Sequence, residues 1–253
     1  MQLYQFQAQQ REKHKKVIKQ HHASQSSQQQ LLTEQDHLLD SVLGHIEHTI
    51  DDLMLKHDIQ KRIAYYENIV LEHAHVATPY YMLMCDYHTL ENHEKTKYYA
   101  LTFLQRKPRE LSQEHQKNQA HFHLIKSYFL LGEYRTAVQH FSQHDDEIVQ
   151  SMPDSAYTEL QVYLIQSYIH LNQAQQVQRH IESVQDMYRS KAWPYDALMA
   201  KVDLSHAEFL YAQGQLKSAH QHLKRVLAFP EHNRKALIFN KTWKKPSFWQ
   251  RLF

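Results

Sequence analysis

Glycine, proline and cysteine are all scarce in this sequence, and each shortage excludes a class of structure. Only 3 glycines and 6 prolines occur in 253 residues, too few for the many tight turns of a β-sandwich or a β-barrel. The single cysteine, Cys85, excludes an intramolecular disulfide and a cysteine-based zinc finger, and it indicates a reducing compartment. Helices are therefore the expected secondary structure.

Long apolar runs, an excess of one charge and the common catalytic motifs are also lacking. No stretch approaches the roughly 18 to 20 apolar residues of a membrane span, and the first residues do not form a secretory signal. The formal net charge of +2 gives no reason to expect a nucleic-acid partner. There is no H-E-x-x-H, glycine-rich phosphate loop or G-x-S-x-G elbow. These absences predict a soluble cytoplasmic protein that is not an enzyme and holds no cofactor.

Composition and periodicity divide the chain into parts of different character. From Leu38 to Leu53 the apolar residues follow the spacing of an amphipathic helix, and a second stripe from Ile59 to Val70 predicts its hairpin partner. We expect four regions: a polar, Gln-rich and basic arm (1–30), an N-terminal helical hairpin (31–76), a set of helical repeats (77–240) and a basic, aromatic C-terminal tail (241–253).

Two of the three glycines indicate an internal repeat. Gly132 and Gly214 lie 82 positions apart, or twice 41, and each stands between two helical patterns. Asn172, midway between them, occupies the same place and is the other residue type that tolerates left-handed backbone. A looser copy runs from Tyr87 to Thr96. Prolines are expected to close the units, because proline ends a helix: Pro108, Pro153, Pro194 and Pro230.

These residues resemble the tetratricopeptide repeat (TPR), in which a large residue precedes a glycine turn and a small residue follows nine positions after the large one. The repeats would start at Ala77, Asn118, Thr158 and Ala200, and this spacing exceeds the family's usual length of about 34 residues, which implies extended helices or turns. The core positions of the first helices are then Leu83/Tyr87, Leu124/Tyr128, Leu164/Tyr168 and Ala207/Leu210. The small positions of the second helices are Thr96, Ala137, Val177 and Ala219. The resemblance implies an all-α fold, an α-solenoid of antiparallel helix pairs that forms a TPR-like superhelix of about five helical hairpins.

In the resembled family the first helix of each unit lines a concave groove that binds segments of other proteins. The corresponding positions here mix aromatic and isolated polar side chains, which suits an extended or helical peptide: Tyr81, Cys85, His88, Phe122, Lys126, Phe129, Val162, Gln166, His170, Leu204, Glu208 and Tyr211. The resemblance implies a non-enzymatic protein- or peptide-binding scaffold or adaptor. The alternative is a peptide-sensing regulator that resembles the pheromone receptors of Gram-positive bacteria but lacks a DNA-binding domain.

The 22 histidines and the C-terminal tail are the remaining candidates for special chemistry. His140 and His144 have a spacing that could hold a divalent metal, and two pairs are weaker: His45 with His48, and His121 with His123. Such pairs arise by chance in a histidine-rich chain, so we assign no metal site. The tail mixes basic and aromatic residues, which favours either a peripheral lipid or partner contact or a cap on the last repeat: Trp243, Phe248, Trp249, Leu252 and Phe253.

Overall fold

The computed structural model describes residues 58–106, 113–229 and 233–243, and all regular structure in these ranges is helical. The helices are α3 (Ile59–Glu72), α4 (Thr78–Thr89), α5 (His93–Gln105), α6 (Gln113–Leu130), α7 (Tyr134–Ser151), α8 (Asp154–His170), α9 (Ala174–Ser190), α10 (Ala197–Ala212), α11 (Leu216–Val226) and α12 (Asn233–Thr242). None of them is long and apolar enough to cross a membrane.

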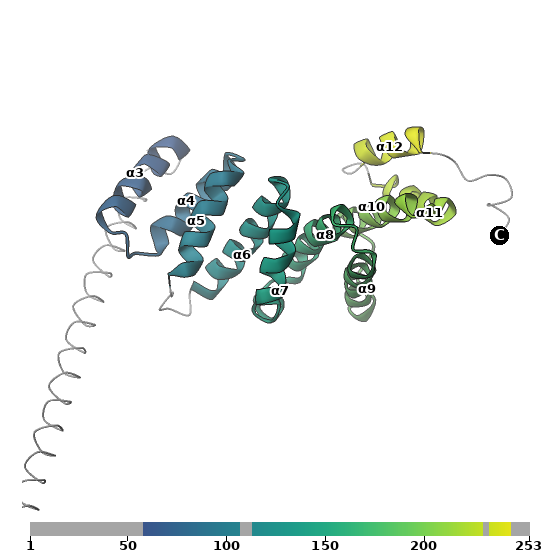
Figure 1. The fold of residues 1–253 in the computed structure, drawn as a ribbon, viewed down its shortest axis with the longest axis horizontal. Helices are drawn as coiled ribbons and strands as arrows, with labels where there is room; N and C mark the ends of the chain where they lie inside the picture. The colour runs from purple at the N-terminus through teal and green to yellow at the C-terminus, as the bar shows by residue number, and fades with distance from the viewer. Residues whose placement is uncertain (1–57, 107–112, 230–232, 244–253) are drawn as a thin grey trace, which may run out of the picture. The chain divides into compact units, whose positions relative to one another are not determined.

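The chain divides into two compact units, residues 1–68 and 69–253, and α3 crosses the boundary between them. The second stripe of the expected N-terminal hairpin falls in α3, whereas the first stripe lies outside the described residues. Within the second unit, the helices from α4 to α11 pack as four consecutive antiparallel pairs, and α12 follows them (Figure 1). The predicted all-α, TPR-like arrangement of roughly five hairpins is confirmed.

One residue in left-handed backbone closes each helix pair. Gly132 and Gly214 both have φ of 76°, and Asn172 has φ of 55°, so the three predicted turns are confirmed. The looser fourth copy places Glu91 there, also with φ of 55°. A Cβ on either glycine would meet no atom within 4 Å, so glycine is favoured at these turns by its backbone freedom and not by lack of space.

The same two hydrogen bonds end the first helix at every one of these turns. At the second pair, the Gly132 N–H donates to the carbonyl of Phe129 at 3.0 Å, and the next N–H donates to the carbonyl of Tyr128 at 2.8 Å. This pattern satisfies carbonyl groups that the helix end would otherwise leave without partners. The large residue that accepts the longer-range bond is itself a buried core residue in each pair: Tyr87, Tyr128, Tyr168 and Leu210.

The core runs between the paired helices at the positions that the repeat predicts. The four small positions of the second helices are fully buried, with 0% of each residue exposed: Thr96, Ala137, Val177 and Ala219. The extra length of the repeats lies partly in the helices, because α6, α7, α8 and α9 each have 17 or 18 residues. Pro153 precedes α8 and Pro194 stands between α9 and α10, as expected, whereas Pro108 and Pro230 lie outside the described residues.

At one fixed register, a buried side chain of the first helix meets a buried or partly buried side chain of the second helix in each unit. The members of each pair are 19 positions apart in the sequence: Tyr80 with Tyr99, His121 with His140, Gln161 with His180, and Asp203 with His222. The repeat pattern in the sequence does not indicate this layer. The first-helix members are at most 3% exposed, so a polar side chain at this position requires a partner inside the protein.

Hydrogen bonds join three of these four pairs. His121 Nδ1 lies 2.9 Å from His140 Nε2. The Nδ1–H of His180 donates to Gln161 Oε1 at 2.6 Å. Burial is the largest cause that lowers the pKa of His180 to about 4 and that of His140 to about 3. These imidazoles are therefore neutral core groups near neutral pH.

We predict that close approach of the paired helices makes Ala137 and Ala219 sensitive to added volume. Replacement of either alanine by leucine should overpack the interface and lower the free energy of unfolding by about 1–3 kcal/mol, measured by urea denaturation. Ala212→Leu, at an exposed site near the end of α10, is the control and should cost less. Equal effects at all three positions would contradict the predicted packing.

We also predict that the buried layer makes stability depend on pH. The pKa of His180 is about 4 in the folded chain against an ordinary value of 6.5, so the unfolded chain binds more protons in that interval. The free energy of unfolding should therefore fall as pH falls from about 6.5 towards 4. His180→Gln removes this titration and should flatten the profile measured by urea denaturation. His170→Gln, which changes an exposed histidine, should not; an unchanged slope in His180→Gln would refute the explanation.

Candidate functional site

The first helices of successive pairs contact one another and form a continuous face. α4 packs against α6, α6 against α8, and α8 against α10. The predicted groove residues all belong to these four helices, and most are partly buried, which suits a lining surface: Tyr81, Cys85, His88, Phe122, Lys126, Phe129, Val162, Gln166, Glu208 and Tyr211. His170 is exposed and Leu204 is buried. We call the surface on α4, α6, α8 and α10 the first-helix face.

Aromatic side chains form the middle of the first-helix face. The ring of Tyr163 lies 6.2 Å from that of Phe122 and 5.4 Å from that of Phe129, between centroids. Lys126 Nζ lies 5.8 Å from the ring centroids of both Phe122 and Tyr163, within the range of a cation–π contact. The family pattern predicts the neighbouring Val162 as a groove residue and does not include the position of Tyr163.

A cavity of about 370 Å³ opens beside these aromatic residues. It is bounded by α6, by the start of α8 with the residues before it, and by the start of α10. Apolar side chains make up one part of its lining: Phe122, Met152, Pro153, Ala156 and Leu198. Polar groups make up the rest: His115, Asn118, Gln119, His123, Ser155 and Glu159. An apolar cavity with a few polar groups is the usual form of a site for a small ligand or a single side chain.

At the α4 end of the face, histidine and tyrosine side chains are packed together. The Tyr81 hydroxyl donates to Gln119 Oε1, and the ring of Tyr81 lies 5.6 Å from that of Phe103. The rings of His88 and His123 are 4.1 Å apart. Burial lowers the pKa of both imidazoles, that of His123 to about 3, and Lys126 lowers both further. These two histidines therefore present neutral rings.

At the other end of the face, predicted lining residues are engaged with one another. The Gln166 amide donates to Ser205 Oγ at 2.8 Å and to Glu208 Oε2 at 3.1 Å. The ring of His170 stacks on that of Tyr134, with centroids 4.1 Å apart. Gln166 and Glu208 thus connect α8 with α10, so they are not simply open to a ligand.

Helix α12 and the residue that follows it cover the α10 end of the face. Leu204 is 9% exposed and belongs to a core cluster against which Phe239 and Trp243 pack. The rings of Tyr211 and Trp243 stack with centroids 4.3 Å apart, and Lys235 forms an ion pair with Glu208. Leu204 is thus a core residue in this structure. Trp243 is one of the five expected tail residues, and the other four lie outside the described residues: Phe248, Trp249, Leu252 and Phe253.

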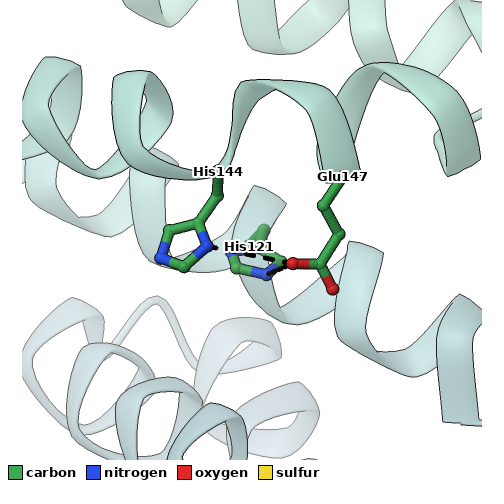
Figure 2. A group of neighbouring side chains, drawn as sticks. All are labelled: His121, His144 and Glu147. Carbon is green, nitrogen blue, oxygen red and sulfur yellow. Dashed lines mark ion pairs between the residues drawn. The ribbon is translucent and has the colours of Figure 1, made fainter.

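A group of histidine and carboxylate side chains lies between α6 and α7 (Figure 2). His121 comes from α6, and His144 and Glu147 come from α7. Glu147 Oε2 lies 3.9 Å from His121 Nε2 and 3.8 Å from His144 Nδ1. Two nitrogen donors and one carboxylate are a ligand set that several divalent transition metals accept.

A second group with metal-binding residue types lies between α10 and α11: Asp203, His206 and His222. Arg225 holds this carboxylate, with its Nε 3.0 Å from Asp203 Oδ2, and the Tyr195 hydroxyl donates to the same oxygen at 2.8 Å. These side chains line a cavity of about 560 Å³. Counted from Ala200, it is His206, and not Ala207, that stands where the other pairs have Leu83, Leu124 and Leu164. Burial lowers the pKa of His206 to about 4.

Comparison with known proteins supports the fold and adds no family assignment. No protein-family model matches the sequence, and no curated protein matches it. Among solved structures, the chain is similar to "YrrB: a TPR protein with an unusual peptide-binding site". The match has a TM-score of 0.55 at 12% sequence identity and covers 72% of this chain and 84% of that one. The architecture of this chain is therefore that of a TPR-like repeat protein.

Proposed function

We propose that this chain is a non-enzymatic scaffold or adaptor of a reducing, cytoplasmic compartment, and that it binds a peptide segment of another protein on the first-helix face. The observation that carries the proposal is the 370 Å³ cavity beside Phe122, which accepts an apolar side chain of a partner. The TPR-like fold supports this function, because such folds typically bind proteins or peptides. The similar structure is itself described as having a peptide-binding site.

The contacts on the face divide the proposed groove into an open part and a covered part. Between α4 and α8, the partly buried aromatic rings, the cavity and the Lys126 ammonium are available to a peptide. Around α10, Tyr211 and Leu204 are covered by Trp243 and by α12. We therefore place the main peptide contacts on Tyr81, His88, Phe122, Lys126, Phe129 and Val162, and the weaker ones on Gln166, His170, Glu208 and Tyr211, and we leave out the buried Leu204.

The chemistry of the open part favours a particular kind of peptide. An apolar or aromatic anchor would enter the cavity, where Phe122 and Met152 provide dispersion contacts. Lys126 would attract an acidic residue of the peptide and so help to set its direction. The neutral rings of His88 and His123 provide hydrogen-bonding groups for the peptide backbone without adding charge.

The proposal is tested by selection of binding peptides from a random display library, followed by titration against the purified chain. Binding is followed by isothermal titration calorimetry on the unlabelled chain, because Cys85, the single cysteine, lies within the proposed groove and a fluorophore there would occupy it. We predict that Phe122→Ala weakens binding of the selected peptides at least about tenfold, because an anchor residue is typically worth more than about 1.4 kcal/mol.

Val149→Ala is the matched control, because Val149 is 51% exposed on the second helix α7. It should leave the dissociation constant unchanged. Equal affinity of wild type and Phe122→Ala would place the binding surface elsewhere, and a library that yields no binding peptide would count against the scaffold function itself.

The lipid contact expected of the tail stays a prediction, and Trp243 changes how it is tested. Because Trp243 stacks on Tyr211 and Phe239, a chain that ends at Lys241 should lose thermal stability. A chain that ends at Trp243 should keep that stability. If residues 244–253 contact anionic lipid, the full chain should co-sediment with anionic vesicles and the chain that ends at Trp243 should not. Failure of the full chain to co-sediment would exclude the lipid contact.

A further inference from the structure

We propose that His121, His144 and Glu147 bind a divalent first-row transition ion, with Zn²⁺ as the representative, and that His140 orients His121. The site is separate from the first-helix face, since two of its ligands come from the second helix α7. Of the pair that the sequence favoured, His140 and His144, only His144 belongs to the proposed ligand set. The fold instead brings together one member from each of two different sequence pairs.

The donor atoms are close to the arrangement that an ion needs. The three donors all lie within 4.8 Å of one another, and two of the separations are 3.8 and 3.9 Å. Ligands at about 2.0–2.1 Å from a tetrahedral ion are about 3.3 Å apart. His144 is 39% and Glu147 44% exposed, so these side chains can close the remaining distance by small rotations while the buried His121 stays in place.

The repeat itself marks His144 as an unusual choice. The equivalent position of the second helix in the other three pairs carries a fully buried apolar residue: Phe103, Val184 and Val226. At His144 the backbone leaves helical geometry, with φ of −129° and ψ of 16°, and α7 is kinked. A polar residue at a core position of one repeat, with the helix bent at that point, indicates that something other than packing determines this residue.

His140 supplies the orientation that a metal-binding histidine usually needs. Its Nε2 lies 2.9 Å from His121 Nδ1, and when the proton of this bond belongs to His121, the other ring nitrogen of His121 carries a lone pair. That nitrogen, Nε2, faces Glu147. A ligand histidine that is held through its second nitrogen by a hydrogen bond is the common arrangement around protein-bound metals.

Charge distinguishes this group from the one on α10 and α11. There, Arg225 already contacts both oxygens of Asp203, at 3.0 Å each, so a guanidinium stands where a cation would bind. At the proposed site, Lys117 Nζ lies 3.6 Å from Glu147 Oε1, whereas both histidine contacts are to Oε2. The ion would therefore use the oxygen that faces the imidazoles, and Lys117 would pair with the other.

Nitrogen donors and the absence of a thiolate among the ligands set the class of ion. Imidazole with carboxylate suits Zn²⁺, Co²⁺ or Ni²⁺, whereas Mg²⁺ and Ca²⁺ prefer ligands that are all oxygen. Three protein donors leave one position of a tetrahedral ion for water or for a group of a partner. Bound in this way, the ion would join α6 to the kinked part of α7.

The test uses the full chain without a polyhistidine tag, with Zn²⁺ titrated by calorimetry and Co²⁺ by visible absorption. His144→Val introduces the residue that Val184 and Val226 provide in the sibling pairs, so the variant should fold. We expect it to weaken Zn²⁺ binding at least about tenfold and to abolish the Co²⁺ absorption of the wild type. Glu147→Gln should act in the same direction and keep the side-chain shape.

His206→Leu is the matched control, because it introduces the residue of the sibling pairs at the other histidine group. It should bind Zn²⁺ as the wild type does, which shows that loss in His144→Val is specific among the many histidines of the chain. The proposal is overturned if the wild type binds neither ion, or if His144→Val and Glu147→Gln retain wild-type affinity.

Discussion

Each helix pair between residues 77 and 229 is closed by one residue with left-handed backbone, and this turn ties the hairpin to its core. The N–H after the turn donates to the carbonyl of the large residue that packs between the two helices, such as Tyr128 or Leu210. The large residue therefore both accepts the hydrogen bond that ends the first helix and packs in the core. The second helix then meets the first at a constant register, and every further repeated contact in the unit depends on that register.

The layer of paired side chains is the clearest consequence of the fixed register. Residues 19 positions apart meet in all four pairs, although the chemistry changes from two tyrosines to two histidines, then to Gln161 with His180 and to Asp203 with His222. A polar group at this depth is tolerated only when the opposite position supplies its partner. The repeat therefore preserves a geometry, and within it each unit can carry a different polar group.

The fold could be predicted because its turns are encoded by single residues, whereas the site depends on contacts between residues far apart in the sequence. Gly132, Asn172 and Gly214 reveal their turns because their residue types favour left-handed backbone. Glu91 adopts the same backbone without such a preference, so that copy looked irregular in the sequence. The covering of Tyr211 by Trp243 joins residues 32 positions apart through a helix with no repeat partner, and no pattern in the sequence indicates it.

Two positions depart from the repeat by placing histidine where the sibling pairs bury an apolar residue, and both departures lie in groups of histidine and carboxylate. Replacement of a buried apolar residue by histidine usually lowers stability, because packing contacts are lost and a polar ring is desolvated. Near His206, Arg225 already pairs with the charge of Asp203. At His144, by contrast, the helix bends and the ring faces Glu147.

The proposed metal site and the proposed groove share helix α6. His121, a proposed ligand, directly precedes Phe122, which lines the cavity. An ion that holds His121 against α7 would therefore restrict the motion of the helix that presents Phe122 to a peptide. The proposed metal site and the proposed groove would thus be coupled through two consecutive residues of α6.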